Sequence, residues 1–473
     1  MAKTQKKTSN SGRTAGKNSG RTAGRTSGRK KGAGRGKGRK KQSIFKRILK
    51  GIGICILILV LAFAGLLAWL SVTEYKPAER VALNVYDPGT TLGASEKSTD
   101  DPGMDFSDEN AGAGNEVENA NSAENAEGAE NADSADNAAG TEGADGTAAG
   151  GTAENGVQAG ESFSIMTWNI GYGALGDNAD FFMDGGKGVK TATETRVKSN
   201  LSDVETEIIK LNPDFTFLQE VDRDSMRSYG MDEAQLISDQ IYSSGIGQAY
   251  DTTFAWNYRV GFIPYPVPPI GKVNSGILTL SSRQIDDSER VQLPCPFSWP
   301  VRLGNLKRCL MIDRVPVTDA DGNRTGRELV LVNLHLEAYD DGEGKAAQTQ
   351  MLSEIIENEV QKGNYVIAAG DFNQSFSGTD TSMYPAQEGK WECGLLDESA
   401  FSDSWNFYMD AATPTCRSLD QPYASADREN FQYYVIDGFI VSNNIEVGSV
   451  ETQDLGFVAS DHNPVLMNFT LGE

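Results

Sequence analysis

Histidine is rare in this chain, and each histidine lies beside polar residues at one end of an apolar run. The 473-residue sequence has two, His335 in LVLVNLHLEAYDD and His462 in VASDHNPVLMNF. An imidazole titrates near neutral pH, so it can take up or release a proton during a reaction. A random pair of histidines would more often be packed or surface residues, but the acids beside these two favour acid–base chemistry.

Carboxylates and amides also follow or interrupt apolar runs. Asp437 lies inside YVIDGFIV, where a buried charge needs a partner, and His462 is a candidate for that partner. Because loops at strand ends build functional sites, this set of polar residues predicts one catalytic centre. The remaining members of the set are Asn169 after SIMTW, Glu220 in DFTFLQEVD, Asp371 and Asn373 after YVIAAG, and Asp461 directly before His462.

The elements that must position these residues are short apolar runs of β-type. Two further stretches, 195–211 and 347–362, carry apolar residues three or four positions apart, which predicts amphipathic helices. Short strands mixed with such helices predict an α+β layered domain around paired sheets, over residues 161–473. The predicted strands are FSIMTWNI, FTFLQEV, SGILTL, CLMIDRVPV, ELVLVNLHL, NYVIAAGDF, YVIDGFIV and PVLMNF.

In their order along the domain, these segments resemble the endonuclease/exonuclease/phosphatase superfamily, which includes deoxyribonucleases, neutral sphingomyelinases and inositol polyphosphate phosphatases. The resemblance implies a four-layer αββα sandwich with the active site at one edge of two packed sheets. Gly171 departs from relatives with an aspartate at that position, which weakens the case for a second carboxylate on the main metal. The matching motifs are TWNIGYG, LQEVD, NSGILTLSS, VNLHLEAYDDG, AAGDFNQS, VIDGFIVS and SDHNPV.

The resemblance, together with the needs of phosphoester hydrolysis, assigns catalytic roles. His462 is the predicted base, oriented and made more basic by Asp437. His335 faces the opposite side of the phosphate, where it stabilises the phosphate or protonates the leaving oxygen. Asp371 and Asn373 orient the water and a phosphate oxygen.

The same resemblance suggests the metal ligands, and a local basic patch suggests one of the substrate-binding residues. Glu220 is the predicted ligand of Mg²⁺ or Mn²⁺, with Asn169 close by and Asp461 as a further contributor, because hard oxygen ligands suit those ions. Two histidines are too few for a histidine-rich zinc cage. Asn274, in NSGILTLSS, and Arg308, in a cluster with Arg302, Lys307 and Arg314, are the predicted substrate-binding residues.

Residues 51–71 are predicted to form one transmembrane helix. The run GIGICILILVLAFAGLLAWL has no charge and is long enough for a bilayer core, and Lys46, Arg47 and Lys50 precede it. The positive-inside rule then places the N-terminus in the cytoplasm and the catalytic domain outside the cell membrane. A cleaved signal peptide is the alternative, but the basic region is long and no small-x-small cleavage site follows.

The formal net charge of −23 is the sum of three unequal regions. Residues 1–50 hold 18 Lys or Arg and no acid, which predicts a disordered basic cytoplasmic tail. Residues 72–160 are an acidic, low-complexity stretch predicted to be an extracytoplasmic linker that holds the domain clear of the membrane, although its segment 75–86 could dock as a strand. Residues 161–473 hold 47 acids and 22 bases.

This acidity argues against tight, nonspecific binding of long nucleic acids, which relies on basic surface. Three functions remain open. A metal-dependent phosphodiesterase could act on a small or lipid-linked phosphoester, an extracellular nuclease could act on DNA or RNA, and a catalytically inactive binding module is the least favoured. The loop FIPYPVPPIGKVNSG, 262–276, could line a pocket, stack on a base, touch lipid or simply pack. No obligate protein partner is predicted.

Other motifs are discounted. The five cysteines lack CxxC spacing, which favours isolated buried thiols, although four of them could form disulfides. DADGNRTG begins like a calcium loop but has Arg324 where glycine is required, so a hairpin turn is predicted there. MDGGKG lacks the spacing of a phosphate-binding loop and is predicted to be a loop beside the active site.

Overall fold

The computed structural model describes residues 44–93, 155–245, 251–340 and 342–473. The predicted disordered tail before residue 44 and most of the predicted acidic linker, within 94–154, lie outside the described residues. The chain divides into two units, Met1–Ala62 and Phe63–Glu473, and the second contains all of the strands in the described ranges.

An apolar helix, α1, covers Ile44–Val72 and so begins before the apolar run at Gly51. Its stretch Lys46–Val72 is 27 residues long and, by length and composition, can cross a membrane. Large apolar side chains from Ile48 to Phe63 are exposed, which suits a helix that meets lipid. Its direction across a membrane stays a prediction.

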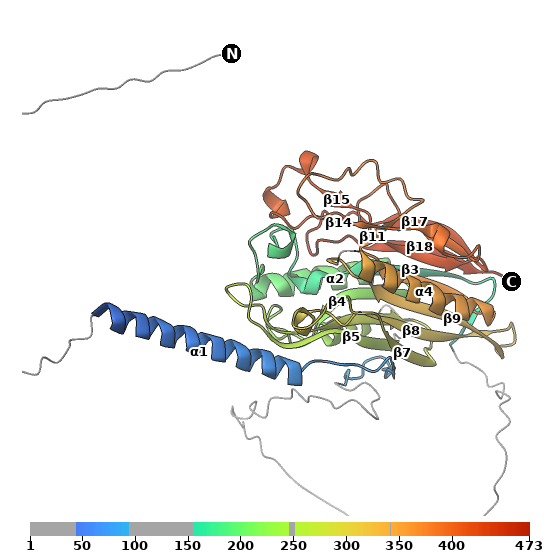
Figure 1. Ribbon diagram of the computed structural model, residues 1–473. Coiled ribbons are helices and arrows are strands. Elements are labelled where there is room, and N and C mark those ends of the chain that lie inside the picture. The colour runs from blue at the N-terminus through green and yellow to red at the C-terminus, as the bar shows by residue number, and fades with distance from the viewer. Residues whose placement is uncertain (1–43, 94–154, 246–250, 341) are drawn as a thin grey trace, which may run out of the picture. The chain divides into compact units, whose positions relative to one another are not determined.

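One sheet contains six strands among the described residues. They are β3 (Ser162–Asn169), β4 (Phe215–Asp222), β5 (Asp251–Ile263), β6 (Gly271–Ser281), β17 (Ile445–Thr452) and β18 (Val465–Leu471). The order is β17-β18-β3-β4-β6-β5, and only β3 and β4 are parallel neighbours. β18, coloured red in Figure 1, therefore returns from the end of the chain to lie beside β3.

The second sheet contains eight strands in the described ranges. They are β1 (Arg80–Ala82), β2 (Val157–Gln158), β7 (Asp287–Gln292), β8 (Cys309–Thr318), β9 (Arg324–His335), β10 (Tyr365–Asp371), β13 (Trp405–Tyr408) and β16 (Asp437–Ser442). The order is β1-β7-β8-β9-β10-β16-β13, with β2 paired to β8. β9 and β10 run parallel, and β16 runs antiparallel to β10.

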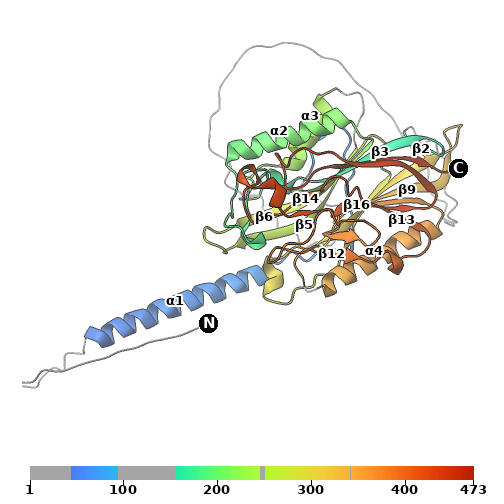
Figure 2. The same cartoon turned by 90° about the horizontal axis from the view of Figure 1, so that it is seen from above.

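Helices cover the outer face of each sheet, and apolar side chains fill the space between the sheets. Figure 2 shows α2 (Glu194–Leu211) and α3 (Glu233–Ser243) on one side and α4 (Glu343–Gln361) on the other. α2 packs through residues such as Val197 and Leu201 on the six-stranded sheet, and α4 packs through Leu352 and Ile356 on the eight-stranded sheet. The predicted α+β four-layer αββα sandwich is confirmed. The layer between the sheets includes Phe163, Ile165, Phe215, Phe217, Leu329, Leu331, Ile367, Phe439 and Met467.

Smaller elements complete the second unit. β11 (Gln374–Phe376) pairs with β12 (Gly394–Leu396), and β14 (Cys416–Arg417) pairs with β15 (Tyr433–Tyr434). Short 3₁₀ turns occupy Gly171–Gly173, Phe182–Asp184, Val301–Gly304, Glu398–Ala400, Tyr423–Ser425 and Arg428–Asn430.

The segment after α1 belongs to the sandwich and not to a free linker. β1 pairs with β7, and Tyr86 forms a bridge with Thr252. Leu83 and Leu92 are buried, because each packs in a hydrophobic cluster of the second unit. The linker predicted over 72–160 therefore has its first described part, up to Gly93, docked on the domain, as the strand alternative for 75–86 allowed.

The predicted helices and the hairpin agree with the structure. The helices expected over 195–211 and 347–362 appear as α2 and α4, each beginning somewhat earlier. DADGNRTG contains the turn between β8 and β9, which pair antiparallel. All five cysteines, each within the described ranges, carry free thiols.

Candidate active site

The polar residues that end the apolar runs meet at one end of the two sheets. In the eight-stranded sheet, Asp371 is the register partner of His335 on β9 and of Asp437 on β16. In the six-stranded sheet, Asn169 ends β3 opposite Gln219, so Glu220 follows at the same sheet edge. The parallel strand pairs therefore deliver their terminal polar residues to one place.

Close packing of β10 on β9 depends on glycine before Asp371. A Cβ atom at Gly370 would lie 1.9 Å from the Leu334 carbonyl oxygen, and the residue has a φ of +151°. Only glycine combines that backbone with that approach. The glycine in AAGDFNQS thus sets the position from which the Asp371 carboxylate reaches the site.

Asp371 lies between the two imidazoles. Its Oδ2 atom is 3.3 Å from His335 Nε2 and 3.8 Å from His462 Nε2. His462 uses its other ring nitrogen, Nδ1, for a contact of 2.9 Å with Asp437 Oδ2. All four side chains are buried, so these short-range contacts act with little screening by water.

Asn169 connects the carboxylates of the two sheets. Its amide nitrogen donates to Asp371 Oδ2 at 3.0 Å and to Glu220 Oε1 at 3.2 Å. Its Oδ1 atom accepts a hydrogen bond of 3.0 Å from the Gly171 backbone N–H. In this geometry Asn169 positions the Glu220 carboxylate and keeps its own oxygen turned away from the carboxylates.

Two site residues have left-handed backbone conformations that non-glycine residues rarely adopt. Glu220 has a φ of 55° and Asn373 a φ of 52°. In β4 the register with β6 shifts between Leu218 and Val221, which leaves Glu220 on a bulge. Such backbone strain costs about 1 to 3 kcal/mol per residue and concentrates at functional sites. Asn373 also donates from its backbone to Asp371 Oδ1 at 2.9 Å.

The loop that carries Asp461 and His462 is held by hydrogen bonds to β3. The Ser460 hydroxyl donates to the Asn169 carbonyl oxygen at 2.7 Å, and Trp168 Nε1 donates to the His462 carbonyl oxygen at 2.9 Å. Both Asp461 and His462 are buried. Their positions are therefore fixed by the same strand that carries Asn169.

Burial raises the pKa values of the site carboxylates. For Asp371, burial and then the charge of Asp437 raise the pKa to about 7, although His462 opposes the shift. For Asp461, burial raises the pKa to about 6, with Glu220 adding to the shift and His462 and Arg417 opposing it. Near neutral pH these carboxylates therefore hold a proton more readily than exposed carboxylates do.

The two imidazoles respond to burial in opposite ways. Burial and the nearby Arg308 lower the pKa of His335 well below its usual value. Burial also opposes protonation of His462, but the charge of Asp437, with a smaller part from Asp371, overcomes it and raises that pKa well above its usual value. One neutral and one proton-holding imidazole thus lie on either side of Asp371.

The donor set fits a hard divalent cation. Glu220, Asp371 and Asp461 border one cavity, and Asp437 Oδ1 has no hydrogen-bond partner among the described residues. Buried carboxylate oxygens in excess are the ligands that Mg²⁺ and Mn²⁺ prefer. Two acid-bearing groups have candidate ligand atoms within 4.8 Å of one another, Asp371 with Asp437 and His462, and Cys416 with Asp461 and His462.

The cavity beside these residues has a volume of about 400 Å³. This is large enough for a small organic phosphoester or a lipid headgroup. Polar site residues form one end of the cavity, and aromatic and aliphatic side chains form much of the remaining wall. The wall includes Leu175, Phe182, Ile263, Tyr265, Trp391 and Tyr434.

The two predicted substrate-binding residues differ in position. Arg308 borders the cavity, where its Nε atom lies 3.3 Å from Glu337 Oε2 and its Nη1 atom donates to the His335 carbonyl oxygen. Asn274 is buried on β6, and its backbone exchanges two hydrogen bonds with Ser225. Ser275, the next residue, borders the cavity in its place.

Arg227 is a cavity residue that sequence reasoning missed. Its guanidinium forms two hydrogen bonds with Asp222, at 2.8 and 2.9 Å, and lies 3.5 Å from the centre of the Tyr172 ring. It follows Glu220 in a loop without any apolar pattern, so the sequence contains no signal that directs it to the site.

A contact across the cavity joins the loop containing MDGGKG to the loop after β9. The Tyr339 hydroxyl lies 3.0 Å from Asp184 Oδ1, and both residues border the cavity. Burial raises the pKa of Asp184 to about 7, although Tyr339 opposes the shift. This loop borders the cavity through Phe182, Met183 and Asp184, beside the site as expected.

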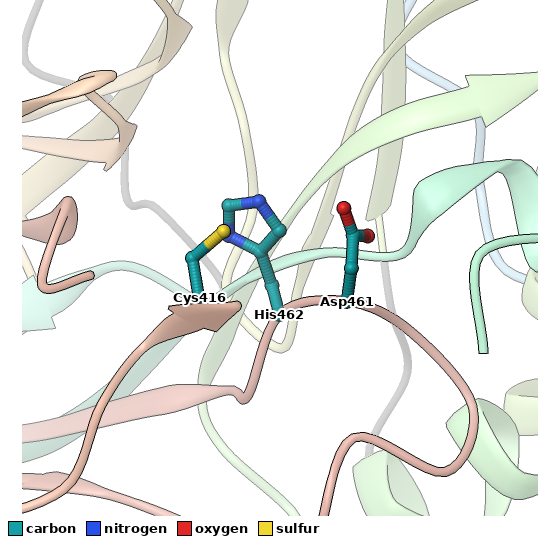
Figure 3. Close-up of side chains that lie close together, drawn as sticks. All are labelled: Cys416, Asp461 and His462. Carbon is teal, nitrogen blue, oxygen red and sulfur yellow. The ribbon is translucent and has the colours of Figure 1, made fainter. Parts of the chain in front are cut away.

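Cys416 was also missed, because a lone cysteine without spacing carries no signal. Figure 3 shows its sulfur against the His462 ring, with Asp461 on the other side of that ring. Burial raises the pKa of the Cys416 thiol to about 12, so it is neutral near pH 7. A neutral thiol packs against the imidazole and is a poor metal ligand.

One comparison with known proteins identifies the family of the domain. The family model described as Endonuclease/Exonuclease/phosphatase family matches residues 166–462, more than half of the chain. No curated protein matches the chain.

Solved structures resemble the domain at low sequence identity. An endonuclease/exonuclease/phosphatase from Beutenbergia cavernae is 18% identical, with a TM-score of 0.44, over 66% of this chain and 72% of that one. Truncated Caenorhabditis elegans TDP2 is 16% identical, with a TM-score of 0.39, over 66% and 98% of the two chains. The human Nocturnin catalytic domain with bound sulfate is 17% identical, with a TM-score of 0.38, over 66% and 93%.

Proposed function

Because the chain belongs to the endonuclease/exonuclease/phosphatase family, whose members hydrolyse phosphoester bonds, we propose that it is a divalent-metal-dependent phosphodiester hydrolase. One observation carries the proposal: Asp371 lies between His335 and His462 at the polar end of a cavity of about 400 Å³. Acid–base groups on both sides of one carboxylate suit in-line attack on a phosphate.

His462 is the proposed base. Asp437 holds its Nδ1 atom at 2.9 Å, which leaves Nε2 directed toward Asp371 and free to take a proton from water. The raised pKa of His462 means that the surrounding carboxylates hold a proton on the ring. The proposal therefore requires the charge of those carboxylates to be offset before the ring can act as a base.

The pair of Asp371 and His335 is the proposed acid. His335 is a neutral imidazole, and the pKa of Asp371 is raised to about 7, so the pair can hold one proton between Nε2 and Oδ2. That proton is available to the leaving oxygen near neutral pH. The side-chain amide of Asn373 is held by the Leu336 carbonyl oxygen at 2.9 Å, which suits a positioning role at the cavity wall.

Glu220 and Asp461 are the proposed ligands of Mg²⁺ or Mn²⁺, with Asn169 holding Glu220 in place. A bound cation of this kind would polarise the phosphoryl oxygen and offset charge in the transition state. Arg308 and Arg227 border the same cavity, where each is already paired with a carboxylate, Glu337 and Asp222. Asn274, from its position on β6, would act only through the neighbouring Ser275.

The proposal also covers the placement of the protein. We propose a single-pass cell-membrane protein with residues 1–50 in the cytoplasm, a membrane helix over 51–71 and the hydrolase, residues 161–473, outside. The basic residues before the apolar stretch of α1 support this direction.

The test is hydrolysis of bis(4-nitrophenyl) phosphate by the full chain in detergent micelles. We expect turnover with Mg²⁺ or Mn²⁺ and none with EDTA, because the cation offsets transition-state charge. His462→Ala should lower kcat by about 10²- to 10⁴-fold with little change in thermal stability. A lesser loss is expected for His335→Ala, which removes one member of a proton-sharing pair.

Three outcomes contradict the proposal. Full activity of His462→Ala would show that His462 is not the base. Equal activity with and without EDTA would show that the reaction needs no metal. Absence of turnover on any of a panel of diesters, including plasmid DNA, with the fold intact would leave the alternative of an inactive binding module.

A further inference from the structure

Two loops of the second unit expose large apolar side chains next to the cavity. Val267 is 91% exposed and Tyr265 68% in the loop between β5 and β6, and Trp299 and Val301 are 55% and 56% exposed in the loop between β7 and β8. We call residues 263–270 and 299–305 the apolar lip. Clustered, exposed aromatic and aliphatic residues mark a surface that meets another apolar phase.

The end of the membrane helix packs on this lip within the same unit. Leu70 is buried in one cluster with Val260 and Leu303. The Trp299 indole nitrogen donates to the Ser71 hydroxyl at 3.1 Å. Glu74, the first acid after the helix, pairs with Arg302 at 3.1 Å. The last turn of the apolar helix and the residues directly after it therefore contact the lip.

The lip also forms part of the cavity wall. Ile263, Tyr265 and Ile270 border the cavity from one loop, and Gly304 and Asn305 border it from the other. The Tyr265 ring also meets the Phe182 ring edge to face, with centroids 5.8 Å apart. The cavity thus runs from the polar site of Glu220 and His462 to the same surface that carries Val267 and Trp299.

We propose that the apolar lip lies in the surface of the bilayer that α1 spans, and that the cavity takes the phosphodiester of a membrane lipid. A helix that ends at Val72 and packs its last turn on the lip leaves the lip at the interface, where tryptophan and tyrosine are favoured. The apolar wall then holds the part of the lipid next to the phosphate.

This inference rests on the proposed hydrolase activity. In the reaction the water oxygen forms a bond to phosphorus, one ester P–O bond breaks, and the leaving oxygen gains a proton while the attacking water loses one. Neither an oxidant nor a reductant is needed. The acidity of residues 161–473, with 47 acids and 22 bases, favours a lipid over a long nucleic acid as the substrate.

The test compares two substrates for the full chain reconstituted in nanodiscs of phosphatidylcholine, phosphatidylethanolamine and phosphatidylglycerol. One substrate is the disc lipid itself, followed by mass spectrometry of its hydrolysis products, and the other is soluble bis(4-nitrophenyl) phosphate. The lip variant is the double substitution Val267→Asp and Val301→Asp, since neither residue borders the cavity. The matched control is Leu236→Asp, an exposed apolar residue on α3.

We expect wild type to hydrolyse both substrates. The lip variant should lose about tenfold or more of the lipid rate and keep the soluble rate within about twofold, because charge removes only the contact with the bilayer. Leu236→Asp should leave both rates unchanged. Retention of the soluble rate also shows that the lip variant is folded.

The proposal is overturned if wild type hydrolyses the soluble diester or plasmid DNA but no disc lipid, or if the lip variant keeps its lipid rate. It is equally overturned if Leu236→Asp loses as much lipid rate as the lip variant. In all of these outcomes turnover of the soluble diester leaves the proposed hydrolase activity standing. Loss of every activity in wild type would instead refute the hydrolase itself.

Discussion

Two groups of charged side chains lie at opposite ends of β9 and β10, and they are built differently. Near the starts of these strands, Arg314 pairs with Glu328 and Glu359, both at 2.8 Å, and Asn364 donates to Glu359 at 3.0 Å. At their ends, Asp371 and Asp437 meet the two histidines. The first group balances its charges with fixed cations, and the second has carboxylates in excess.

The pKa values follow this difference. Burial would raise the pKa of Glu359, but hydrogen bonds from Arg314 and Lys362 outweigh it and lower the pKa to about 2. In the second group, burial raises the pKa of Asp371 to about 7 and that of Asp461 to about 6. The comparison shows that burial alone does not determine the protonation state of a carboxylate. The carboxylates that have no paired arginine or lysine remain available to bind a cation.

The largest expected difference between the two ends is in activity. Asp437→Asn should lower kcat by about 10²- to 10⁴-fold, because His462 loses the charge that orients it and makes it basic. Thermal stability should change little, since the replacement keeps the size of the side chain. Hydrolysis of bis(4-nitrophenyl) phosphate measures the effect.

Asp313→Asn is the matched control for that change. Asp313, on β8, is also buried, but it accepts hydrogen bonds from Ser288 of the same sheet and from Thr253 of the six-stranded sheet and does not border the cavity. Activity should survive its substitution. Equal losses of kcat for Asp313→Asn and Asp437→Asn would show that both substitutions act through folding alone. That result would contradict the catalytic role of Asp437.

At the balanced end, the expected effect is on stability. Arg314→Met should destabilise the domain by about 2 kcal/mol, because it leaves Glu359 buried without its main partner. The loss of stability is smaller than for a fully enclosed ion pair, because Lys362 and Asn364 still bond to Glu359. A melting temperature lowered by about 5 °C, with kcat unchanged, would match this. A lowered kcat at unchanged melting temperature would contradict the separation of the two ends.

The last expected effect, also on stability, has the opposite sign. Asp461→Asn should stabilise the metal-free protein by about 1 to 3 kcal/mol near pH 8, because it removes a buried charge that burial disfavours. The same variant should lose most of the stabilisation that Mg²⁺ gives wild type. Thermal unfolding in EDTA and in Mg²⁺ measures both.

The pH dependence of this effect has a defined direction. The folded pKa of Asp461, about 6, lies above the unfolded value, so the folded state binds the proton more tightly. The Asp461 proton contributes fully to the free energy of unfolding below the unfolded pKa, near 4. This contribution is lost as the pH rises through about 6. In EDTA, wild type and Asp461→Asn should therefore differ most at pH 8 and least near pH 4. A constant difference between these pH values would exclude Asp461 as the source.

Much of the site was predictable because strand ends converge. His335 and Asp371 lie near the ends of apolar runs and Asp437 interrupts one, and neighbouring strands in register place them side by side. The sandwich itself follows from the same runs and two amphipathic helices. In contrast, α3 was not singled out, although Ala234, Ile237 and Ile241 have helical spacing.

Other features depend on facts that a sequence does not contain. Asn274 and Ser275 are adjacent, and the alternation of side chains along a strand decides which of them borders the cavity. Arg227 reaches the cavity only because a loop turns back over Tyr172. The left-handed backbone of Glu220 depends on a bulge against β6, which a pattern of apolar residues does not reveal.

The docking of β1 on β7 changes what the acidic stretch can do. Leu92, just before residues 94–154, packs in a cluster of the second unit, and Asn155, just after them, bonds to Ser282 of the same unit. Residues 94–154 therefore connect two points of one domain, and under the proposed membrane placement their length does not determine how far the domain lies from the bilayer. A protease that cut within them would nick the protein without shedding it. Under that placement, release of the domain would require a cut in the few residues between Val72 and Arg80, beside the apolar lip.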